Sequence, residues 1–213
     1  MSDGERDRFI DRLVSNGYLK SERVIKAFGS VPRHLFVPEE IRDVAYDDCP
    51  QPIGFNQTIS APHMVAIMTE LLDVRPDSGI LEVGTGSGYQ AAILAELAPQ
   101  GLVVSLERVP ELADRAGRTL RELGYGNVRV VEGDGTLGFR ECAPYDRILV
   151  TAAAPAVPKS LVGQLAAGGR LLVPVGGRWS QTLLEVDRDG RGRVSERSHG
   201  GCVFVPLIGR EGW

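Results

Sequence analysis

Hydrophobic and polar residues follow helical patterns in the first third of this chain and strand-like patterns later. Residues 8–14 and 21–28 each have apolar positions on one helical face, and Ser21 is the predicted N-cap of the second segment. Residues 61–72 show a third helical pattern, for which Ser60 is the predicted N-cap. The N-terminal part of the chain is therefore predicted to be helical.

From residue 79 onward, short apolar runs alternate with segments of helical character. This alternation favours an α/β fold, with a parallel sheet and helices on both faces. Two later strand-like runs, 181–186 and 201–207, flank a polar stretch without a helical stripe. We expect them to form a hairpin that adds an antiparallel edge to the mostly parallel sheet. The strands of the parallel part are predicted near residues 79–83, 102–107, 128–132, 146–151 and 170–175.

A glycine-rich run, Ile80-Leu81-Glu82-Val83-Gly84-Thr85-Gly86-Ser87-Gly88-Tyr89, is the most informative segment. Glycine permits positive φ angles and lets the backbone approach a ligand closely, and the apolar residues that follow favour a helix. The run therefore predicts a strand, a ligand-binding loop and a helix N-terminus. A dinucleotide fingerprint needs glycine at position 89, where this chain has tyrosine, and no Gly-Lys-Ser/Thr occurs here. The spacing argues against pyrophosphate and P-loop sites.

Acidic residues stand at the ends of three successive predicted strands. Glu82 precedes the first glycine, where its carboxylate could meet a cationic amine, and Glu107 could accept both hydroxyls of a ribose. Asp134 follows the third run and offers a polar contact to an adenine amine. Acids at strand ends are often simply solvated, and a glycine triplet can be only a tight turn. Their order nevertheless resembles the S-adenosylmethionine site of Rossmann-like methyltransferases, because open α/β sheets bind ligands at this edge.

Length and composition favour a single domain over residues 1–213, because 43% hydrophobic residues suffice for a sizeable core. The net charge of −4 gives no electrostatic footprint for nucleic acid or an anionic membrane. The sequence has neither an apolar signal core nor a long apolar span, so we expect a cytoplasmic protein. Its three widely spaced cysteines indicate neither a disulfide framework nor a metal site.

The segment Ile53-Gly54-Phe55-Asn56-Gln57-Thr58-Ile59-Ser60-Ala61-Pro62-His63-Met64 resembles the signature of the protein-L-isoaspartate O-methyltransferase family. Enzymes of this family methylate isomerised aspartyl residues in damaged proteins. The resemblance extends over roughly residues 8–208. Further matches follow in the expected order: Val31-Pro32-Arg33, Phe36-Val37-Pro38, Leu81 to Tyr89, Gly133-Asp134-Gly135, Pro144-Tyr145-Asp146, Ala152-Ala153-Ala154-Pro155, Gly168-Gly169-Arg170-Leu171, Pro174-Val175-Gly176 and Val203-Phe204-Val205-Pro206-Leu207.

The resemblance implies a Rossmann-like class I methyltransferase fold with S-adenosyl-L-methionine as cofactor. It implies three parts: a helical, substrate-covering segment 1–60, a cofactor-binding core 61–176 and C-terminal strands 177–213. In the family, the serine matching Ser60 is taken as the active-site residue. The resemblance assigns substrate binding to Ser60, Val205, Pro206 and Leu207. It assigns cofactor binding to Gln57, Thr58, Ile59, Ser60, Glu82, Gly84, Thr85, Gly86, Ser87, Glu107, Arg108, Asp134 and Gly135.

The implied chemistry explains why the sequence has no recognisable catalytic base. An α-carboxylate has a reference pKa of roughly 3.5, so an isoaspartyl carboxylate is already a nucleophile at neutral pH. The implied partners are isoaspartyl proteins and peptides, with the enzyme acting as a monomer. Three alternatives stay open at this point: a peptide-specific aspartate methyltransferase, a small-molecule methyltransferase of the same fold, and a non-catalytic cofactor-binding module. Ser60 could also serve only as a helix cap.

Overall fold

The computed structural model describes the backbone of residues 3–213 and the side chains of residues 5–213. The chain begins with two helices, α1 (Asp3–Ser15) and α2 (Glu22–Ser30), as the apolar pattern predicts. Ser21 precedes α2 but its side chain makes no capping hydrogen bond. Its hydroxyl donates instead to the Glu70 carboxylate of the third helix, so the predicted cap is replaced by a tertiary contact.

A short hairpin, which the sequence pattern missed, follows two 3-10 turns, η1 (Arg33–Phe36) and η2 (Glu39–Val44). The hairpin pairs β1 (Gln51–Gly54) with β2 (Gln57–Ile59), and residues 55 and 56 at its turn both have positive φ angles. Two adjacent positive φ angles are typical of the tight turns that join antiparallel strands. Strands of four and three residues are too short to show a period-2 pattern, so this segment reads as a loop from sequence.

The main sheet has seven strands in the order β5-β4-β3-β6-β7-β8-β9. The five strands β5, β4, β3, β6 and β7 are parallel to one another. At one edge of the sheet, β8 pairs antiparallel with β7, and β9 pairs antiparallel with β8. This confirms the predicted α/β fold with an antiparallel C-terminal edge. The strands are β3 (Ile80–Val83), β4 (Val103–Glu107), β5 (Val128–Glu132), β6 (Tyr145–Val150), β7 (Leu165–Gly176), β8 (Gln181–Arg188) and β9 (Val194–Cys202).

Helices cover both faces of this sheet, and two apolar clusters fill the layers between them. One cluster joins α1 and α2 to α3 (Pro62–Leu72), α4 (Tyr89–Leu97) and α5 (Pro110–Glu122). The other lies beneath α6 (Lys159–Val162), next to the turns η3 (Gly135–Leu137) and η4 (Arg140–Cys142). Neighbouring strand residues such as Ile80 and Leu81 belong to different clusters, because side chains alternate between the faces of a strand.

The prediction of a last strand over residues 201–207 is wrong, because β9 is Val194–Cys202. Polar residues form this edge strand, whose pairing uses backbone groups and leaves most of its side chains exposed. Residues 203–207 leave the sheet edge and cross toward the end of β6. There the backbone nitrogens of Ala153 and Leu207 donate to the Val205 and Ala153 carbonyls, both at 2.8 Å. This crossing brings the C-terminal segment to the edge that holds the candidate site.

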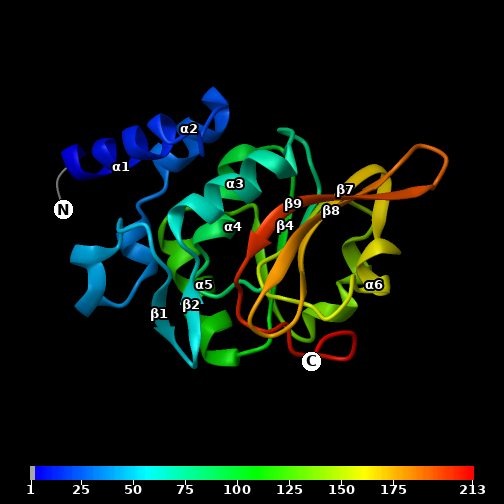
Figure 1. Cartoon of the computed structure of the whole chain (residues 1–213). Coiled ribbons are helices and arrows are strands. Elements are labelled where there is room, and N and C mark those ends of the chain that lie inside the picture. The colour runs from blue at the N-terminus through cyan, green and yellow to red at the C-terminus, as the bar shows by residue number, and fades with distance from the viewer. Residues whose placement is uncertain (1–2) are drawn as a thin grey trace.

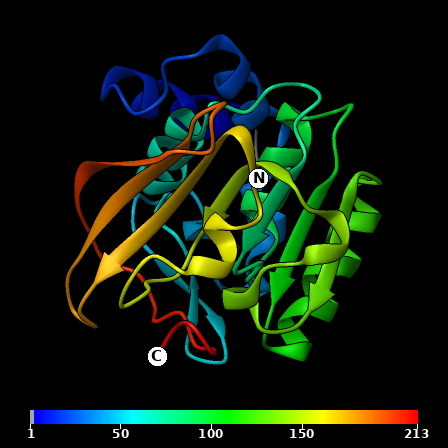
Figure 2. The ribbon, with the colours of Figure 1, turned by 90° about the vertical axis from the view of Figure 1, so that its right-hand side faces the viewer.

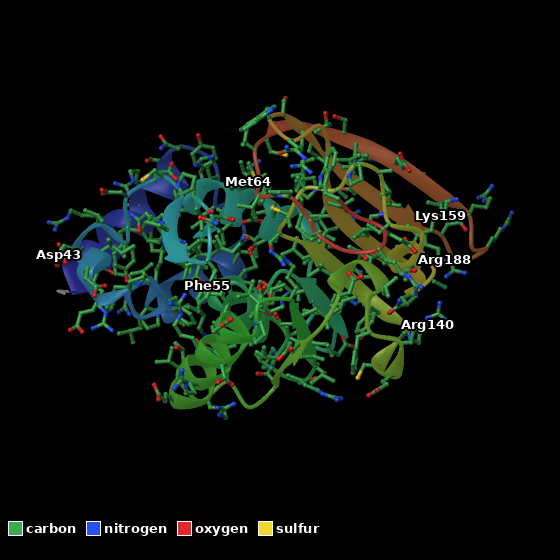
Figure 3. The ribbon with its side chains drawn as sticks, turned by 90° about the horizontal axis from the view of Figure 1, so that it is seen from below. Asp43, Phe55, Met64, Arg140, Lys159 and Arg188 are labelled. Carbon is green, nitrogen blue, oxygen red and sulfur yellow. The ribbon has the colours of Figure 1, made fainter. Side chains whose placement is uncertain are left out.

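The β1–β2 hairpin and the C-terminal segment both lie at the lower edge of the molecule in Figures 1 and 2. The view from below in Figure 3 shows Asp43 of η2 at one end and Lys159 and Arg188 toward the other. In the part of the chain that the structure describes, no helix combines the length and apolarity needed to cross a bilayer. The three-part division of the chain stays a prediction.

Candidate functional site

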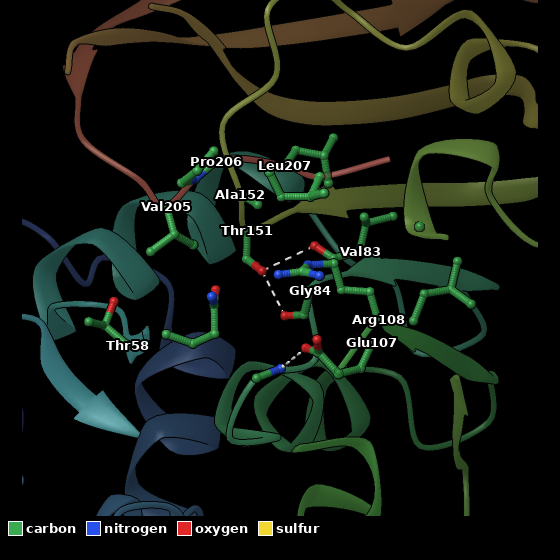
Figure 4. A pocket seen from close by; sticks show the side chains of 15 residues that line it. Thr58, Val83, Gly84, Glu107, Arg108, Thr151, Ala152, Val205, Pro206 and Leu207 are labelled. Carbon is green, nitrogen blue, oxygen red and sulfur yellow. Dashed lines mark hydrogen bonds between the residues drawn. The ribbon is translucent and has the colours of Figure 1, made fainter. Parts of the chain in front are cut away.

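A cavity of about 530 Å³ lies where the carboxyl ends of β3, β4 and β6 meet (Figure 4). A second cavity, of about 440 Å³, adjoins it and shares Thr58, Gly84, Gly86 and Thr151 with the first. The first cavity is lined by Gln57, Thr58, Val83, Gly84, Gly86, Leu106, Glu107, Arg108, Gly135, Thr151, Ala152 and residues 205–208.

The glycine-rich loop forms the floor shared by the two cavities. Gly84 has a φ angle of +100°, and a Cβ atom there would collide with the Thr151 hydroxyl. That hydroxyl donates to the Gly84 carbonyl at 2.7 Å and to the Val83 carbonyl at 3.1 Å. Glycine is therefore required at position 84 both by backbone conformation and by the close approach of β6. Thr85 and Ser87, also predicted cofactor residues, line the second cavity.

Glu107 lies at the end of β4 and lines the first cavity, as predicted. Its Oε2 atom accepts the Gly86 backbone N–H at 2.8 Å, and its Oε1 atom accepts that of Val109 at 2.9 Å. Each carboxylate oxygen can accept a further hydrogen bond. Glu107 thus ties the glycine loop to β4 and keeps acceptor capacity for a pair of hydroxyl groups. Arg108, the next predicted residue, lines the same cavity with an exposed side chain.

Asp134 lies beside the cavity, which its neighbour Gly135 lines. Its Oδ1 atom accepts the backbone N–H of Thr136 at 2.9 Å, and its Oδ2 atom accepts that of Arg210 at 2.9 Å. Burial alone would raise the pKa of Asp134, but these hydrogen bonds outweigh it and hold the pKa below its usual value. Asp134 therefore remains a charged acceptor while it fastens the C-terminal tail to η3.

The C-terminal tail beyond Ile208 is held at a second point, by Glu211. The Glu211 backbone N–H donates to Thr136 Oγ1 at 3.1 Å, and its carboxylate accepts the Ser160 hydroxyl and the Ser160 N–H. These contacts bridge η3 and α6 and hold Ile208 in the cavity wall. No motif in the sequence pointed to this arrangement, because the motifs that carry the resemblance end near residue 208.

Glu82 lies near the end of β3, as the sequence predicts, but its side chain is buried in the interior. The residue lines neither cavity, and a direct contact between its carboxylate and a bound amine stays a prediction. Its Oε2 atom accepts the Ser105 hydroxyl, and Ser105 in turn lies 2.6 Å from the Thr85 hydroxyl. Burial raises the pKa of Glu82 to about 8, so the side chain is mostly protonated at neutral pH. Glu82 supports the glycine loop from beneath.

The segment Gln57 to Ser60 forms the opposite wall of both cavities. Thr58 lines both, Gln57 only the first, and Ile59 and Ser60 only the second. Ser60 is not the cap of α3, because Ala61 occupies the N-cap position. Within residues 5–213 no group is hydrogen bonded to the Ser60 hydroxyl, which leaves it available to a ligand.

An open groove continues from the cavities past Ser60 to the crossing segment. Thr58, Thr151, Val205 and Pro206 line both this groove and the first cavity. Other parts of its wall are exposed apolar side chains, with Trp179 89% exposed to solvent. Of the predicted substrate residues, Ser60, Val205 and Pro206 line the groove, whereas Leu207 lines only the first cavity.

Several residues of the site escaped the sequence interpretation, among them Ser105, Thr151 and Ile208. Thr151 follows directly after the apolar run of β6, so its strand-end position was a usable signal. Ser105 was visible only as one polar residue in an otherwise apolar strand. Ile208 gave no signal, because its place in the wall depends on how the tail folds back.

The class of the protein follows from the fold. A Plasmodium falciparum structure, named as a protein-L-isoaspartate O-methyltransferase in complex with S-adenosyl-L-homocysteine, aligns with a TM-score of 0.83 and 26% sequence identity. The match covers 94% of this chain and 97% of that one. The shared architecture, with its glycine loop at the carboxyl edge of the sheet, defines a class I methyltransferase.

Sequence relatives give the family. The family described as protein-L-isoaspartate(D-aspartate) O-methyltransferase (PCMT) matches residues 4–212. A protein from Methanopyrus kandleri named protein-L-isoaspartate O-methyltransferase is 58% identical over 210 residues, which is 98% of this chain and 93% of that protein. A protein of the same name from Hyperthermus butylicus is 51% identical, over 98% of this chain and 90% of that protein. The chain belongs to the PCMT family.

Proposed function

We propose that this enzyme transfers a methyl group from S-adenosyl-L-methionine to the free α-carboxyl group of L-isoaspartyl residues in damaged proteins and peptides. The observation that carries the proposal is the wall shared by the cofactor cavity and the groove, formed by Thr58, Thr151, Val205 and Pro206. A groove bordered by solvent-exposed residues admits a polypeptide chain, whereas a small-molecule methyltransferase needs a closed acceptor pocket. A carboxylate lying in the groove at Ser60 would stand at the mouth of the cavity.

The residues of the cavity fit the cofactor. Glu107 offers acceptors for ribose hydroxyls, and Gly84 and Gly86 let the backbone approach the methionine part. Gly135 lines the same cavity and packs so closely on Val83 that a side chain there would collide with it. When bound, S-adenosyl-L-methionine supplies a methyl group activated by its positively charged sulfur. Since the substrate carboxylate is ionised at neutral pH, the protein has only to orient the acceptor oxygen and exclude water.

Ser60 carries the orienting role in this proposal. Its hydroxyl, which no group within residues 5–213 engages, would donate a hydrogen bond to one carboxylate oxygen. The other carboxylate oxygen would then be oriented to accept the methyl group that the bound cofactor supplies. The products are the methyl ester and S-adenosyl-L-homocysteine. In the released ester, the following backbone nitrogen displaces methanol and closes a succinimide, whose hydrolysis returns part of the material to normal aspartate. Repair therefore proceeds through repeated rounds of methylation.

The proposed setting is a monomeric enzyme in the cytoplasm that acts on isoaspartyl proteins and needs neither nucleic acid nor membrane. The net charge of −4 supports the independence from nucleic acid and anionic membranes, because it provides no broad attraction to polyanions.

The test is methyl transfer from labelled cofactor to three peptides of one sequence that contain isoaspartate, aspartate or asparagine at one position. We expect labelling of the isoaspartyl peptide only. Equal labelling of the aspartyl peptide would indicate a general aspartate methyltransferase, and binding of S-adenosyl-L-homocysteine without any labelling would indicate a non-catalytic module. Either result would overturn the proposal.

A further inference from the structure

Arg33 is a fully buried cation close to the proposed active site, and neither the cofactor cavity nor the groove is lined by it. Its Nε atom donates to the Ala45 carbonyl at 2.7 Å, and one terminal nitrogen donates to the Ser60 carbonyl at 2.8 Å. The guanidinium carbon lies 4.8 Å from the centre of the Tyr89 ring, which lines the second cavity. Arg33 thus holds the peptide group of the one residue proposed to touch the substrate carboxylate.

The charge of Arg33 has no matching carboxylate in the part of the chain that the structure describes. Its hydrogen bonds end on neutral carbonyls, and its Nη1 atom is buried without a hydrogen-bond partner. The phenol groups of Tyr89 and Tyr46 have the larger favourable effects on this charge. The carboxylate of Asp48 has a weaker effect, and the ring and backbone nitrogens of His63 engage it. Guanidinium groups stay protonated in proteins, and burying an uncompensated charge is costly. A negatively charged ligand that binds nearby would stabilise a buried positive charge of this kind.

We infer that Arg33 is a positioning residue that fixes the Ser60 backbone and supplies the buried positive charge by which the site favours an anionic carboxylate. The inference rests on the proposed function for the identity of that carboxylate. It gives a role to the Val31-Pro32-Arg33 segment, which the sequence marks as a family feature without a function. The expected consequence is electrostatic: peptides with a free α-carboxylate bind better than neutral analogues because of Arg33.

The experiment compares two ligands of one peptide sequence, an isoaspartyl peptide and its α-carboxamide analogue, which cannot ionise. The protein with its native arginine should bind the carboxylate form at least about 10-fold more tightly, a ratio obtained from KM and from inhibition by the amide. Arg33→Met should bring that ratio close to 1 by weakening only the carboxylate form. Arg33→Lys, which retains the charge, should restore most of the ratio.

A control is available in Arg23, a solvent-exposed arginine that also donates to two backbone carbonyls, those of Val74 and Leu97. Arg23→Met also removes an arginine that donates to two carbonyls, but it should leave the carboxylate preference unchanged. S-adenosyl-L-homocysteine affinity, measured by calorimetry, should stay within about twofold in every variant, since Arg33 lines no part of the cofactor cavity. If Arg33→Met does not fold, Arg33→Gln replaces that variant in the comparison, because glutamine is neutral and keeps one donor group.

The outcomes separate this inference from the proposed function. If the unmodified enzyme fails to methylate the isoaspartyl peptide, the proposed function fails. If it methylates that peptide but Arg33→Met and Arg33→Gln keep the carboxylate preference, Arg33 has only a structural role and the inference is wrong. Equal loss of the preference in Arg23→Met would also contradict it.

Discussion

The cofactor half and the peptide half of the site are built in opposite ways. Around Gly84 and Glu107, the backbone is fixed by positive φ angles, close packing and hydrogen bonds, and the side chains are buried. Around Ser60 and Val205, two segments far apart in sequence meet at an open groove, and the Ser60 hydroxyl is unpaired within residues 5–213. The comparison indicates that the protein preorganises the cofactor and leaves room for varied polypeptide substrates.

The largest expected effect is on the rigid half, from Gly84→Ala. The new Cβ atom meets the Thr151 hydroxyl, and alanine is strained at a φ angle of +100°. We expect S-adenosyl-L-homocysteine to bind at least about 100-fold more weakly, which corresponds to about 3 kcal/mol. Calorimetry would measure this, with Gly126→Ala as control because nothing lies within 4 Å of a Cβ atom there. Unchanged affinity in Gly84→Ala would show that the loop is not rigid.

Ser60→Ala tests the open half. Loss of a hydrogen bond to a charged group costs about 1.5–3 kcal/mol, so turnover should fall by about 10-fold or more. Cofactor affinity should change by less than about threefold, because Ser60 lines the second cavity but not the first. Single-turnover rates and calorimetry together provide the measurement. Unchanged turnover in folded Ser60→Ala enzyme would remove the residue from the reaction.

Glu107→Ala should produce the reverse pattern. Removing its carboxylate deletes the acceptor of the Gly86 N–H and the proposed ribose acceptor, which should weaken cofactor binding by about 1–3 kcal/mol. The KM for the peptide should change little at saturating cofactor. A variant with normal affinity for S-adenosyl-L-homocysteine would show that Glu107 serves only to hold the loop.

Glu82→Gln has the smallest expected effect on cofactor binding and turnover, and its effect appears instead as a changed dependence of stability on pH. Burial raises the pKa of Glu82 to about 8 in the folded protein, whereas the unfolded chain has a pKa of about 4.5. The stabilisation of the fold by the neutral carboxyl group is therefore complete below about pH 4.5. This contribution is lost as pH rises through about 8, with a slope of at most about 1.4 kcal/mol per pH unit. Glutamine has no such titration. Urea unfolding from pH 5 to 8 should therefore show a steeper decline for the unmodified protein, and parallel curves would contradict the burial argument.

The two halves also differ in how well the sequence predicted them. The glycine loop and Glu107 are encoded locally, because a strand followed by glycines leads to the same edge of the sheet whatever the rest of the chain does. The direction of a side chain was harder to predict, because Glu82 lies at the predicted strand end but its side chain is buried in the interior. The peptide half joins residues 57–60 with residues 203–208, and only family resemblance linked these segments. The β1–β2 hairpin and the true limits of β9 depend on tertiary pairing, which hydrophobic periodicity does not record.

The most direct test of the contrast between a preorganised cofactor site and an open peptide groove is the pH dependence of the chemical step. A preformed cofactor site and a substrate that is already ionised require orientation but no proton acceptor. Single-turnover rates on an isoaspartyl peptide, with cofactor and peptide saturating, should therefore be nearly flat between about pH 6 and 8. His63, which lines the groove and is hydrogen bonded to Asp48, is the histidine that could act as a base there. A steep fall in rate below pH 7 that His63→Gln abolishes together with most of the activity would contradict the account.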